Sequence, residues 1–289
     1  MIGRPARYVD GLPTPPRTLV MGVVNVTPDS FSDGGLWLEP DKAIAHGRQL
    51  VEDGADLLDV GGESTRPGAE RPSEEEELRR VIPVVTALAA EGALVSVDTM
   101  RANVARQAID AGARAINDVS GGLADERMLP LVAETGVAYV CMHWRGHSHD
   151  MQSRATYANV VEEVVEELAP RIKAAEQAGI DRNKLAIDPG LGYAKTADHN
   201  WTILAGLDRL HQLELPVLVA ASRKTFLGRL LADQETGDLR PTRDRDDASS
   251  ATSALAAMAG AWCVRVHAVR PSLDAVRVAA RWAAEPHGV

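Results

Sequence analysis

The sequence predicts a single-domain (β/α)8 barrel of the α/β class, and three observations lead to this fold. Short apolar runs alternate in strict order with longer amphipathic segments along the chain. The short runs are continuously apolar rather than alternating, which is typical of strands buried on both faces of a parallel sheet. The chain has 289 residues, and a (β/α)8 barrel typically has roughly 250. No linker or internal repeat divides the chain, so residues 1–289 are expected to form one domain.

Each expected strand is followed by an expected helix. The strands are expected at 19–26, 57–61, 94–98, 115–118, 138–143, 185–188, 217–222 and 262–267. The helices are expected at 40–53, 73–91, 101–111, 125–135, 157–178, 197–213, 248–259 and 272–284. Several of these helical segments stop at a glycine, such as Gly54 and Gly92, which is a common helix end. Ser73 is predicted to cap its helix, and the glutamates at 74–77 are expected to be a solvated first turn.

Two segments fall outside this alternation. Residues 1–18 are expected to be an N-terminal extension, and residues 233–247 a flexible charged insertion, because this second stretch is polar and has no periodicity. An open doubly wound sheet is the alternative fold, and it would favour a phosphate-binding glycine fingerprint after the first strand. Neither GxGxxG nor GxxxxGK occurs in the chain, so the barrel is favoured.

Composition excludes several classes of partner and location. The formal net charge is -10, and an acidic surface repels nucleic-acid phosphates, so no nucleic-acid partner is expected. Cys141 and Cys263 lie in apolar runs and are expected to be buried reduced thiols, as in cytoplasmic proteins. The longest apolar run, residues 254–264, is shorter than the ~20 residues of a membrane span. The N-terminal residues have no apolar segment, so no secretory signal is expected. We therefore expect a soluble cytoplasmic protein with no membrane partner.

Polar side chains stand at the C-terminal ends of the expected strands, which line one mouth of a barrel. Asp98, Asn117 and Asp188 end three of these strands. Burying such groups together is costly unless they meet a polar ligand. Carboxylates and an amide suit a flat heterocycle with several N–H donors, and two carboxylates can hold a guanidine-like N–C–N edge.

Cationic side chains form the other half of the same expected mouth. Arg66, Lys224, Arg265 and His267 stand near strand ends in an otherwise acidic chain. Such a cluster suits a phosphate or diphosphate. Arg265 and His267 are two residues apart on the last strand, so their side chains share one face. The pattern therefore indicates a site for a flat heterocycle that carries phosphate.

A histidine-rich segment, HWRGHSHD, offers a second candidate site. It contains His143, His147, His149 and Asp150, which are all residue types that bind metals. The segment has no recognisable zinc spacing, so no metal site is expected there.

The strand-end motifs resemble those of one enzyme family. MGVVNVTPDSFSDGG, DVGGESTRPGA, SVDTMR, INDVSGG, IDPGLGYAKT, ASRKTFLG and VRVHAV resemble the corresponding segments of dihydropteroate synthases, in the family's order. The resemblance covers nearly the whole chain from Met21 onward and is closest to the actinobacterial members. It implies a transferase of folate biosynthesis that condenses 6-hydroxymethyl-7,8-dihydropterin diphosphate with p-aminobenzoate. The products would be 7,8-dihydropteroate and diphosphate, and sulfonamides would compete with p-aminobenzoate.

The resemblance also implies which residues hold each group. The pterin would be held by Asp98, Asn117, Met142, Asp188 and Lys224. The diphosphate would be held by Asn25, Arg66, Arg265 and His267, with Mg2+ near Asn25 and Asp33. The p-aminobenzoate pocket would be lined by Thr65, Pro67, Tyr193, Lys224 and Thr225. The catalytic candidates are Phe31, Asp33, Arg66 and Lys224, and the first two would stabilise the electron-poor methylene as its C–O bond breaks.

Two other functions compete with this one. A pterin-binding methyltransferase that serves a corrinoid would share the barrel and the carboxylates, but it needs neither the Arg–x–His pair nor the STRPGA loop. A non-catalytic pterin-binding paralogue would not need the complete cationic set.

The last two helices carry SATSALAAMAGA and LDAVRVAARWAA, and their small residues allow close packing. The family resemblance suggests a homodimer there.

Overall fold

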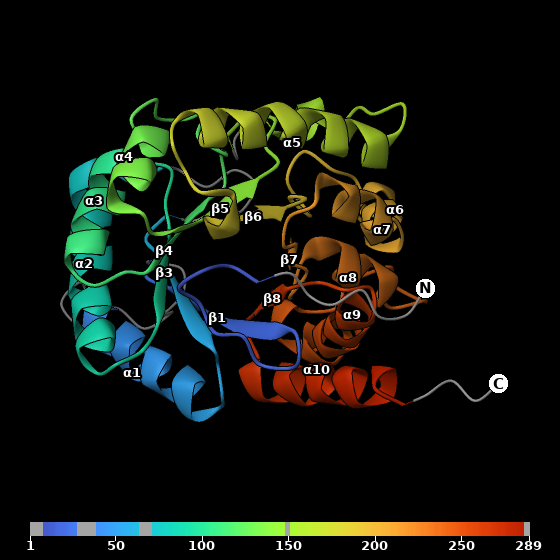
Figure 1. Ribbon diagram of the computed structural model, residues 1–289. Helices are drawn as coiled ribbons and strands as arrows, with labels where there is room; N and C mark the ends of the chain where they lie inside the picture. Colours follow the sequence, from blue (N-terminus) through green and yellow to red (C-terminus); the bar gives the residue numbers. More distant parts are fainter. Residues whose placement is uncertain (1–7, 28–38, 64–70, 148–150, 286–289) are drawn as a thin grey trace.

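The computed structural model describes residues 8–27, 39–63, 71–147 and 151–285 and forms a (β/α)8 barrel (Figure 1). The strands of this part of the chain are β1 (Leu19–Asn25), β2 (Leu57–Gly61), β3 (Val95–Asp98), β4 (Ala115–Asp118), β5 (Ala138–Met142), β6 (Leu185–Asp188), β7 (Leu218–Val219) and β8 (Cys263–Val266). They pair in parallel in the order β6-β5-β4-β3-β2-β1-β8-β7. A parallel bridge between Ile187 and Val217 joins the two ends of this sheet, so the barrel is nearly closed.

A ring of helices surrounds the strands (Figure 1). The helices are α1 (Glu39–Glu52), α2 (Glu74–Ala90), α3 (Ala102–Asp110), α4 (Met128–Thr135), α5 (Val160–Gln177), α6 (Ala197–Ala205), α7 (Leu207–Leu210), α8 (Thr225–Leu230), α9 (Asp246–Met258) and α10 (Val269–Ala283). The Ser73 hydroxyl accepts a hydrogen bond from the Glu76 N–H at 3.1 Å, which confirms the predicted cap of α2. No helix among the described residues is long and apolar enough to cross a membrane.

The barrel interior changes from apolar to polar along the strands. Successive residues of a strand point alternately inward and toward the helices. The apolar inner cluster is built from Leu19, Met21, Leu57, Ala115, Ala138, Val140, Ala186, Leu218 and Cys263. The described part of the N-terminal extension adds Val9 and Leu12 to this cluster. Nearer the C-terminal ends of the strands, the inward positions are polar: Asp59, Ser96, Asn117 and Arg265. The barrel interior at this end can therefore interact with a polar ligand.

The structure differs from the predicted helices at two places. The single helix expected at 197–213 is interrupted at Gly206, after which the chain forms α7 and a 3-10 turn (His211–Leu213). A Cβ at Gly206 would lie 3.1 Å from a Val161 methyl and 3.2 Å from the Thr202 carbonyl oxygen, so a side chain would crowd this turn where it approaches α5. The short helix α8 directly after β7 was not predicted, because six residues hold too little periodicity to be recognised.

The expected insertion also contains regular structure. Within residues 233–247, Thr242–Arg245 forms a 3-10 turn, and Asp246 already belongs to α9. Acidic residues in a first helical turn interact favourably with the helix dipole, so the charges at 246 and 247 suit the helix as well as a loop.

Glu77 contradicts the prediction of a solvated glutamate run. Its side chain is fully buried, accepts a hydrogen bond from the Thr99 hydroxyl at 2.5 Å and forms an ion pair with Arg101. It shares the inward face of α2 with Val81 and Val84, one and two turns further along. Burial raises the pKa of Glu77, and the contacts with Thr99 and Arg101 oppose that shift. Cys141 and Cys263 are buried and free, as predicted.

Candidate active site

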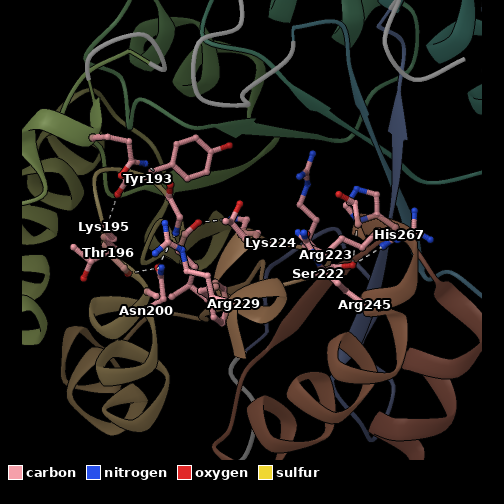
Figure 2. A pocket seen from close by; sticks show the side chains of 18 of the residues that line it. Tyr193, Lys195, Thr196, Asn200, Ser222, Arg223, Lys224, Arg229, Arg245 and His267 are labelled. Carbon is pink, nitrogen blue, oxygen red and sulfur yellow. Dashed lines mark hydrogen bonds between the residues drawn. The ribbon is translucent and has the colours of Figure 1, made fainter. Parts of the chain in front are cut away.

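A cavity of about 770 Å³ opens at the C-terminal ends of the strands (Figure 2). Its wall includes residues from β1, β3 and β8, from the loop after β6 and from the start of α8. The predicted site residues in this wall are Asn25, Asp98, Tyr193, Lys224, Thr225, Arg265 and His267. Residues up to 242 positions apart in the chain thus meet at one mouth, because parallel strands end on the same side of the barrel.

Other predicted site residues are not part of the described wall. Met142 and Asp188 end β5 and β6, and Asn117 is the last residue but one of β4. All three are buried and do not line the cavity. Met142 packs with Tyr193 in a small apolar cluster at this end of the barrel. The residues that lie outside the described part of the chain are Phe31, Asp33, Thr65, Arg66 and Pro67, together with His149 and Asp150 of the histidine-rich segment.

Arg265 forms a buried ionic network with two aspartates inside the barrel. Its Nε donates to Asp59 Oδ2 at 2.6 Å, and its Nη2 donates to Asp98 Oδ2 at 2.9 Å. Asn117 Nδ2 also donates to Asp59 Oδ2, at 2.9 Å. Burial raises the pKa of Asp98 to about 7, Arg265 opposes this shift, and Asp59 adds to it. Two acids around one guanidinium leave an excess of acceptors, which favours a ligand edge rich in N–H donors.

Asp59 is a residue of the buried network that the sequence interpretation missed. It is fully buried in the middle of β2, and the strand-end argument did not consider such positions. A usable signal was present, because a carboxylate inside a continuously apolar strand requires a buried partner. Its cation, Arg265, lies 206 residues later in the chain, so local sequence could not identify the pair.

Lys224 lies in the cavity wall between Tyr193 and His267 (Figure 2). Its Nζ donates to the carbonyl oxygen of Leu191 and stands 5.0 Å from the centre of the Tyr193 ring. Burial lowers the pKa of Lys224 to about 8, and Asp188 is the main group that opposes this shift. Lys224 is therefore a cation at neutral pH.

His267 is oriented by Ser222, a residue that the sequence interpretation did not single out. The Ser222 hydroxyl oxygen accepts from the His267 backbone N–H at 3.2 Å and lies 3.0 Å from Nδ1 of the same residue. A hydroxyl that accepts the backbone N–H can donate its own hydrogen to Nδ1, which leaves the ring proton on Nε2. That tautomer presents an N–H donor, as an anionic ligand requires.

The chain is similar to proteins of known family along almost its whole length. The family described as "Pterin binding enzyme" matches residues 21–267. The dihydropteroate synthase of Mycobacterium leprae (strain TN) is 54% identical over 264 residues, which is 91% of this chain and 93% of that protein. The Yersinia pestis dihydropteroate synthase with a sulfonamide drug superposes with a TM-score of 0.88 at 40% identity, covering 97% of this chain and 100% of that chain. The Xanthomonas albilineans dihydropteroate synthase in complex with 7,8-dihydropteroate gives a TM-score of 0.84 at 43% identity, covering 98% and 100%. The buried acids, the cations at the mouth, the barrel and these similarities agree, and the chain belongs to the dihydropteroate synthase family.

Proposed function

We propose that this chain carries out the reaction of its family in the cavity at the strand ends. It is a transferase of folate biosynthesis, which joins 6-hydroxymethyl-7,8-dihydropterin diphosphate to p-aminobenzoate and releases 7,8-dihydropteroate and diphosphate. The observation that carries the assignment of the cavity is the buried network of Arg265 with Asp59 and Asp98, next to Lys224.

The pterin would bind against the ends of β3, β4 and β6, where the acceptors lie. Asp98, Asn117, Asp188 and Lys224 would hold its polar edge, and Met142 would pack against its ring. Burial raises the pKa of Asp188, and Lys224 is the main group that opposes the shift. A carboxylate that is costly to ionise when buried gains most from N–H donors of a ligand. This cost supports a role for Asp188 in binding the aminopyrimidine part of the pterin.

The diphosphate would bind where the cations meet the mouth of the barrel. Arg265 and His267 line the cavity from β8, and Arg66 is the further cation that we assign to this group. Guanidinium and imidazole N–H groups are strong donors to phosphate oxygens. As the C–O bond to the methylene breaks, these donors stabilise the negative charge that develops on the leaving group.

We propose that Mg2+ binds near the end of β1. Asn25 lines the cavity, and an amide oxygen is a hard ligand of the kind that this ion accepts. Asn25 and Asp33 would hold the ion together with diphosphate oxygens. When bound, the ion supplies positive charge to the leaving diphosphate.

The aromatic amine would bind beside Tyr193, Lys224 and Thr225, with Thr65 and Pro67 completing the pocket. The tyrosine ring gives an aromatic wall for the aminobenzoate ring. An arylamine is neutral near pH 7 and has a free lone pair, so these residues need only orient it toward the methylene. Phe31 and Asp33 are the residues we assign to the electron-poor methylene, together with Arg66 and Lys224 as catalytic groups.

Diphosphate release in the presence and absence of p-aminobenzoate tests this function. We expect release to require both substrates and to be inhibited by sulfanilamide in competition with p-aminobenzoate, because both carry an aniline ring. A methyltransferase would release no diphosphate under either condition. A non-catalytic paralogue would bind a pterin analogue in calorimetry without releasing diphosphate, and either result would contradict the proposal.

We also propose that the chain forms a homodimer through α9 and α10, which lie side by side (Figure 1). Leu255 on α9 is 70% exposed, and on α10 Val278 is 62% and Trp282 is 67% exposed. Large apolar side chains gathered on neighbouring helices are typical of a surface that associates. Two copies of the same surface would satisfy the symmetry of a dimer.

Replacing both Leu255 and Trp282 by glutamate is expected to convert the dimer into a monomer. The substitutions place charges in an apolar contact, where they cannot be paired. Light scattering after size exclusion measures the mass directly. Leu123→Glu is the matched control, because Leu123 is a 51% exposed leucine outside α9 and α10, and this variant should stay dimeric. A monomeric wild type would contradict the proposal, as would a double variant that stays dimeric.

The cytoplasm is the location that we propose for the chain. Two buried thiols without a disulfide suit a reducing compartment. Fractionation of the source cells would test this, and recovery of the chain outside the cytoplasmic fraction would contradict it.

A further inference from the structure

Lys195 is a buried lysine beside the cavity that the proposed reaction has not used. It lies on the loop between β6 and α6, lines the cavity and is only 3% exposed. Its Nζ lies 3.0 Å from Nδ1 of His143 and 3.0 Å from the carbonyl oxygen of Tyr193. Burial lowers the pKa of Lys195 to about 7, and Asp188 is the main group that opposes this shift. The two acceptors offset part of the cost of burying the amine.

The backbone between Tyr193 and Lys195 has a strained conformation, which allows the hydrogen bond from Lys195 to the Tyr193 carbonyl oxygen. Ala194 has φ 48°, in the left-handed region, and is fully buried. This conformation costs a non-glycine residue roughly 1–2 kcal/mol and persists only where the surroundings hold it. The turn at Ala194 lets Lys195 donate to the carbonyl of Tyr193, two residues earlier. The lysine thus holds the turn that carries the tyrosine.

His143 connects this turn to the frame of the barrel. Its backbone N–H donates to the carbonyl oxygen of Asp188 at 2.9 Å, and its Nε2 lies 2.9 Å from Oε2 of Glu167 on α5. Burial, together with the charge of Lys195, lowers the pKa of His143 to about 4. The hydrogen bond between His143 and Glu167 lowers the pKa of Glu167 to about 2. At neutral pH the histidine is neutral and the glutamate ionised. Nε2 therefore donates to Glu167, and Nδ1 accepts from Lys195.

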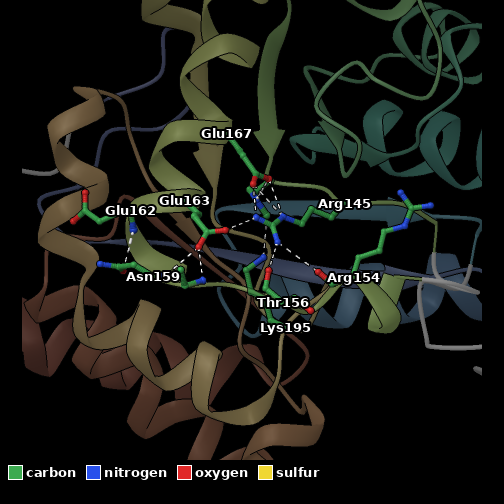
Figure 3. Close-up of polar contacts among 10 residues, drawn as sticks. Arg145, Arg154, Thr156, Asn159, Glu162, Glu163, Glu167 and Lys195 are labelled. Atoms are coloured by element: carbon green, nitrogen blue, oxygen red, sulfur yellow. Dashed lines mark hydrogen bonds and ion pairs between the residues drawn. The ribbon is translucent and has the colours of Figure 1, made fainter.

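The outer end of this chain of contacts is also fixed. Arg145 donates through Nε to both carboxylate oxygens of Glu167, at 3.1 and 3.0 Å, and through Nη2 to Glu163 Oε2 at 2.9 Å (Figure 3). Its guanidinium also lies 3.8 Å over the ring of Tyr157. Lys195, His143, Glu167 and Arg145 form a continuous series of polar contacts from the cavity wall to the surface of α5. We call this series the Lys195 relay.

The inner end of the relay is the wall of the second-substrate pocket. The Tyr193 ring stands 5.0 Å from Lys224 Nζ and packs with Met142. The same loop offers the Leu191 carbonyl to Lys224, and the Gly192 N–H donates to Asn200 at 2.7 Å. A shift of the turn at Ala194 would therefore move the aromatic wall. The pterin acceptors, Asp188 included, belong to the strands β3, β4 and β6 and would stay in place.

We propose that Lys195 is a positioning residue for the aromatic-amine substrate, which fixes the ring of Tyr193 through the Tyr193 carbonyl and His143. The inference rests on the proposed function of the cavity and adds to it the residue that sets the shape of the second pocket. Lys195 acts through Tyr193 and does not itself take part in the bond changes. Its loss should therefore affect the aromatic amine far more than the pterin.

Lys195→Met tests the proposal, because methionine keeps an unbranched side chain but donates no hydrogen bond. We expect KM for p-aminobenzoate to rise about tenfold or more, because the loss of a buried hydrogen bond leaves its acceptors unsatisfied. KM for the pterin diphosphate and kcat should change by less than about threefold. Glu167→Gln weakens the outer part of the relay and should raise KM for p-aminobenzoate by a smaller factor. Lys195→Arg retains donors for both acceptors and should recover part of the loss.

Lys184→Met is the matched control, because Lys184 also donates to a backbone carbonyl, that of Gly136. Lys184 lies in the turn just before β6, at the opposite end of the barrel from the cavity. It should lower stability without changing either KM. Equal rises of both KM values in Lys195→Met would overturn the proposal, and so would lower stability with unchanged KM values.

Calorimetric binding of sulfanilamide, with a pterin analogue and diphosphate present, separates this inference from the proposed function. Weaker sulfanilamide binding by Lys195→Met, with unchanged binding of the pterin analogue, supports the positioning role even if no turnover is detected. Absence of turnover in the wild type would contradict the proposed function alone. Unchanged sulfanilamide binding by Lys195→Met would contradict the positioning role alone.

Discussion

Replacing Arg265 by methionine is expected to lower kcat/KM for the pterin diphosphate by about 100- to 1000-fold, or about 3–4 kcal/mol. The substitution removes a cation assigned to the diphosphate. It also leaves Asp59 and Asp98 without the guanidinium that now joins them at 2.6 and 2.9 Å. Both effects concern the same side chain, because Asp98, which we assign to the pterin, also holds the arginine that we assign to the diphosphate.

Steady-state kinetics and urea unfolding together separate these two effects. Breaking a buried ion pair from one side costs about 3–5 kcal/mol of stability. Adding Asp59→Asn to Arg265→Met removes the unpaired charge, so it should recover part of the stability and none of the activity. Arg229→Met, at an exposed arginine in the same cavity wall, is the control and should keep kcat/KM within about twofold. A value for Arg265→Met within tenfold of the wild type would contradict the assignment.

The convergence of the strand ends could be predicted from sequence because it depends on topology alone. Asn25, Asp98 and Arg265 belong to strands whose apolar runs were recognisable, and parallel strands of a barrel end at one mouth. The contacts among these residues could not be predicted in the same way. Arg265 meets Asp59 across 206 residues, and nothing near either position in the sequence indicates the other.

Inward-facing acids on helices and strands were harder to recognise than acids at strand ends. Glu77 lies within a glutamate run, and composition alone suggests solvent for every member of such a run. Its burial follows from the partners Thr99 and Arg101, which come from the turn after β3. The break at Gly206 was missed for a related reason, because it depends on how closely the turn approaches Val161. Such features follow from tertiary packing, which local periodicity does not contain.

Replacing Lys224 by methionine is expected to lower kcat/KM by about 1000-fold, or about 4 kcal/mol. Lys224 is the one residue that we assign to both substrates. It opposes the raised pKa of Asp188 on the pterin side and stands 5.0 Å from the Tyr193 ring on the aminobenzoate side. It also donates to the Leu191 carbonyl, so its loss disturbs the position of the loop after β6.

The pH dependence of kcat/KM distinguishes the charge of Lys224 from its packing. Burial lowers the pKa of Lys224 to about 8, so the side chain is a cation below that pH and loses its charge as the pH rises further. Wild-type kcat/KM should therefore fall as the pH is raised from 7 to 9. Lys224→Arg keeps its charge throughout this range, because an arginine pKa lies above about 12. Its kcat/KM, although lower at pH 7, should stay level up to pH 9. The same alkaline decline in Lys224→Arg would assign the titration to another group, and a Lys224→Met variant within tenfold of the wild type would remove Lys224 from the catalytic set.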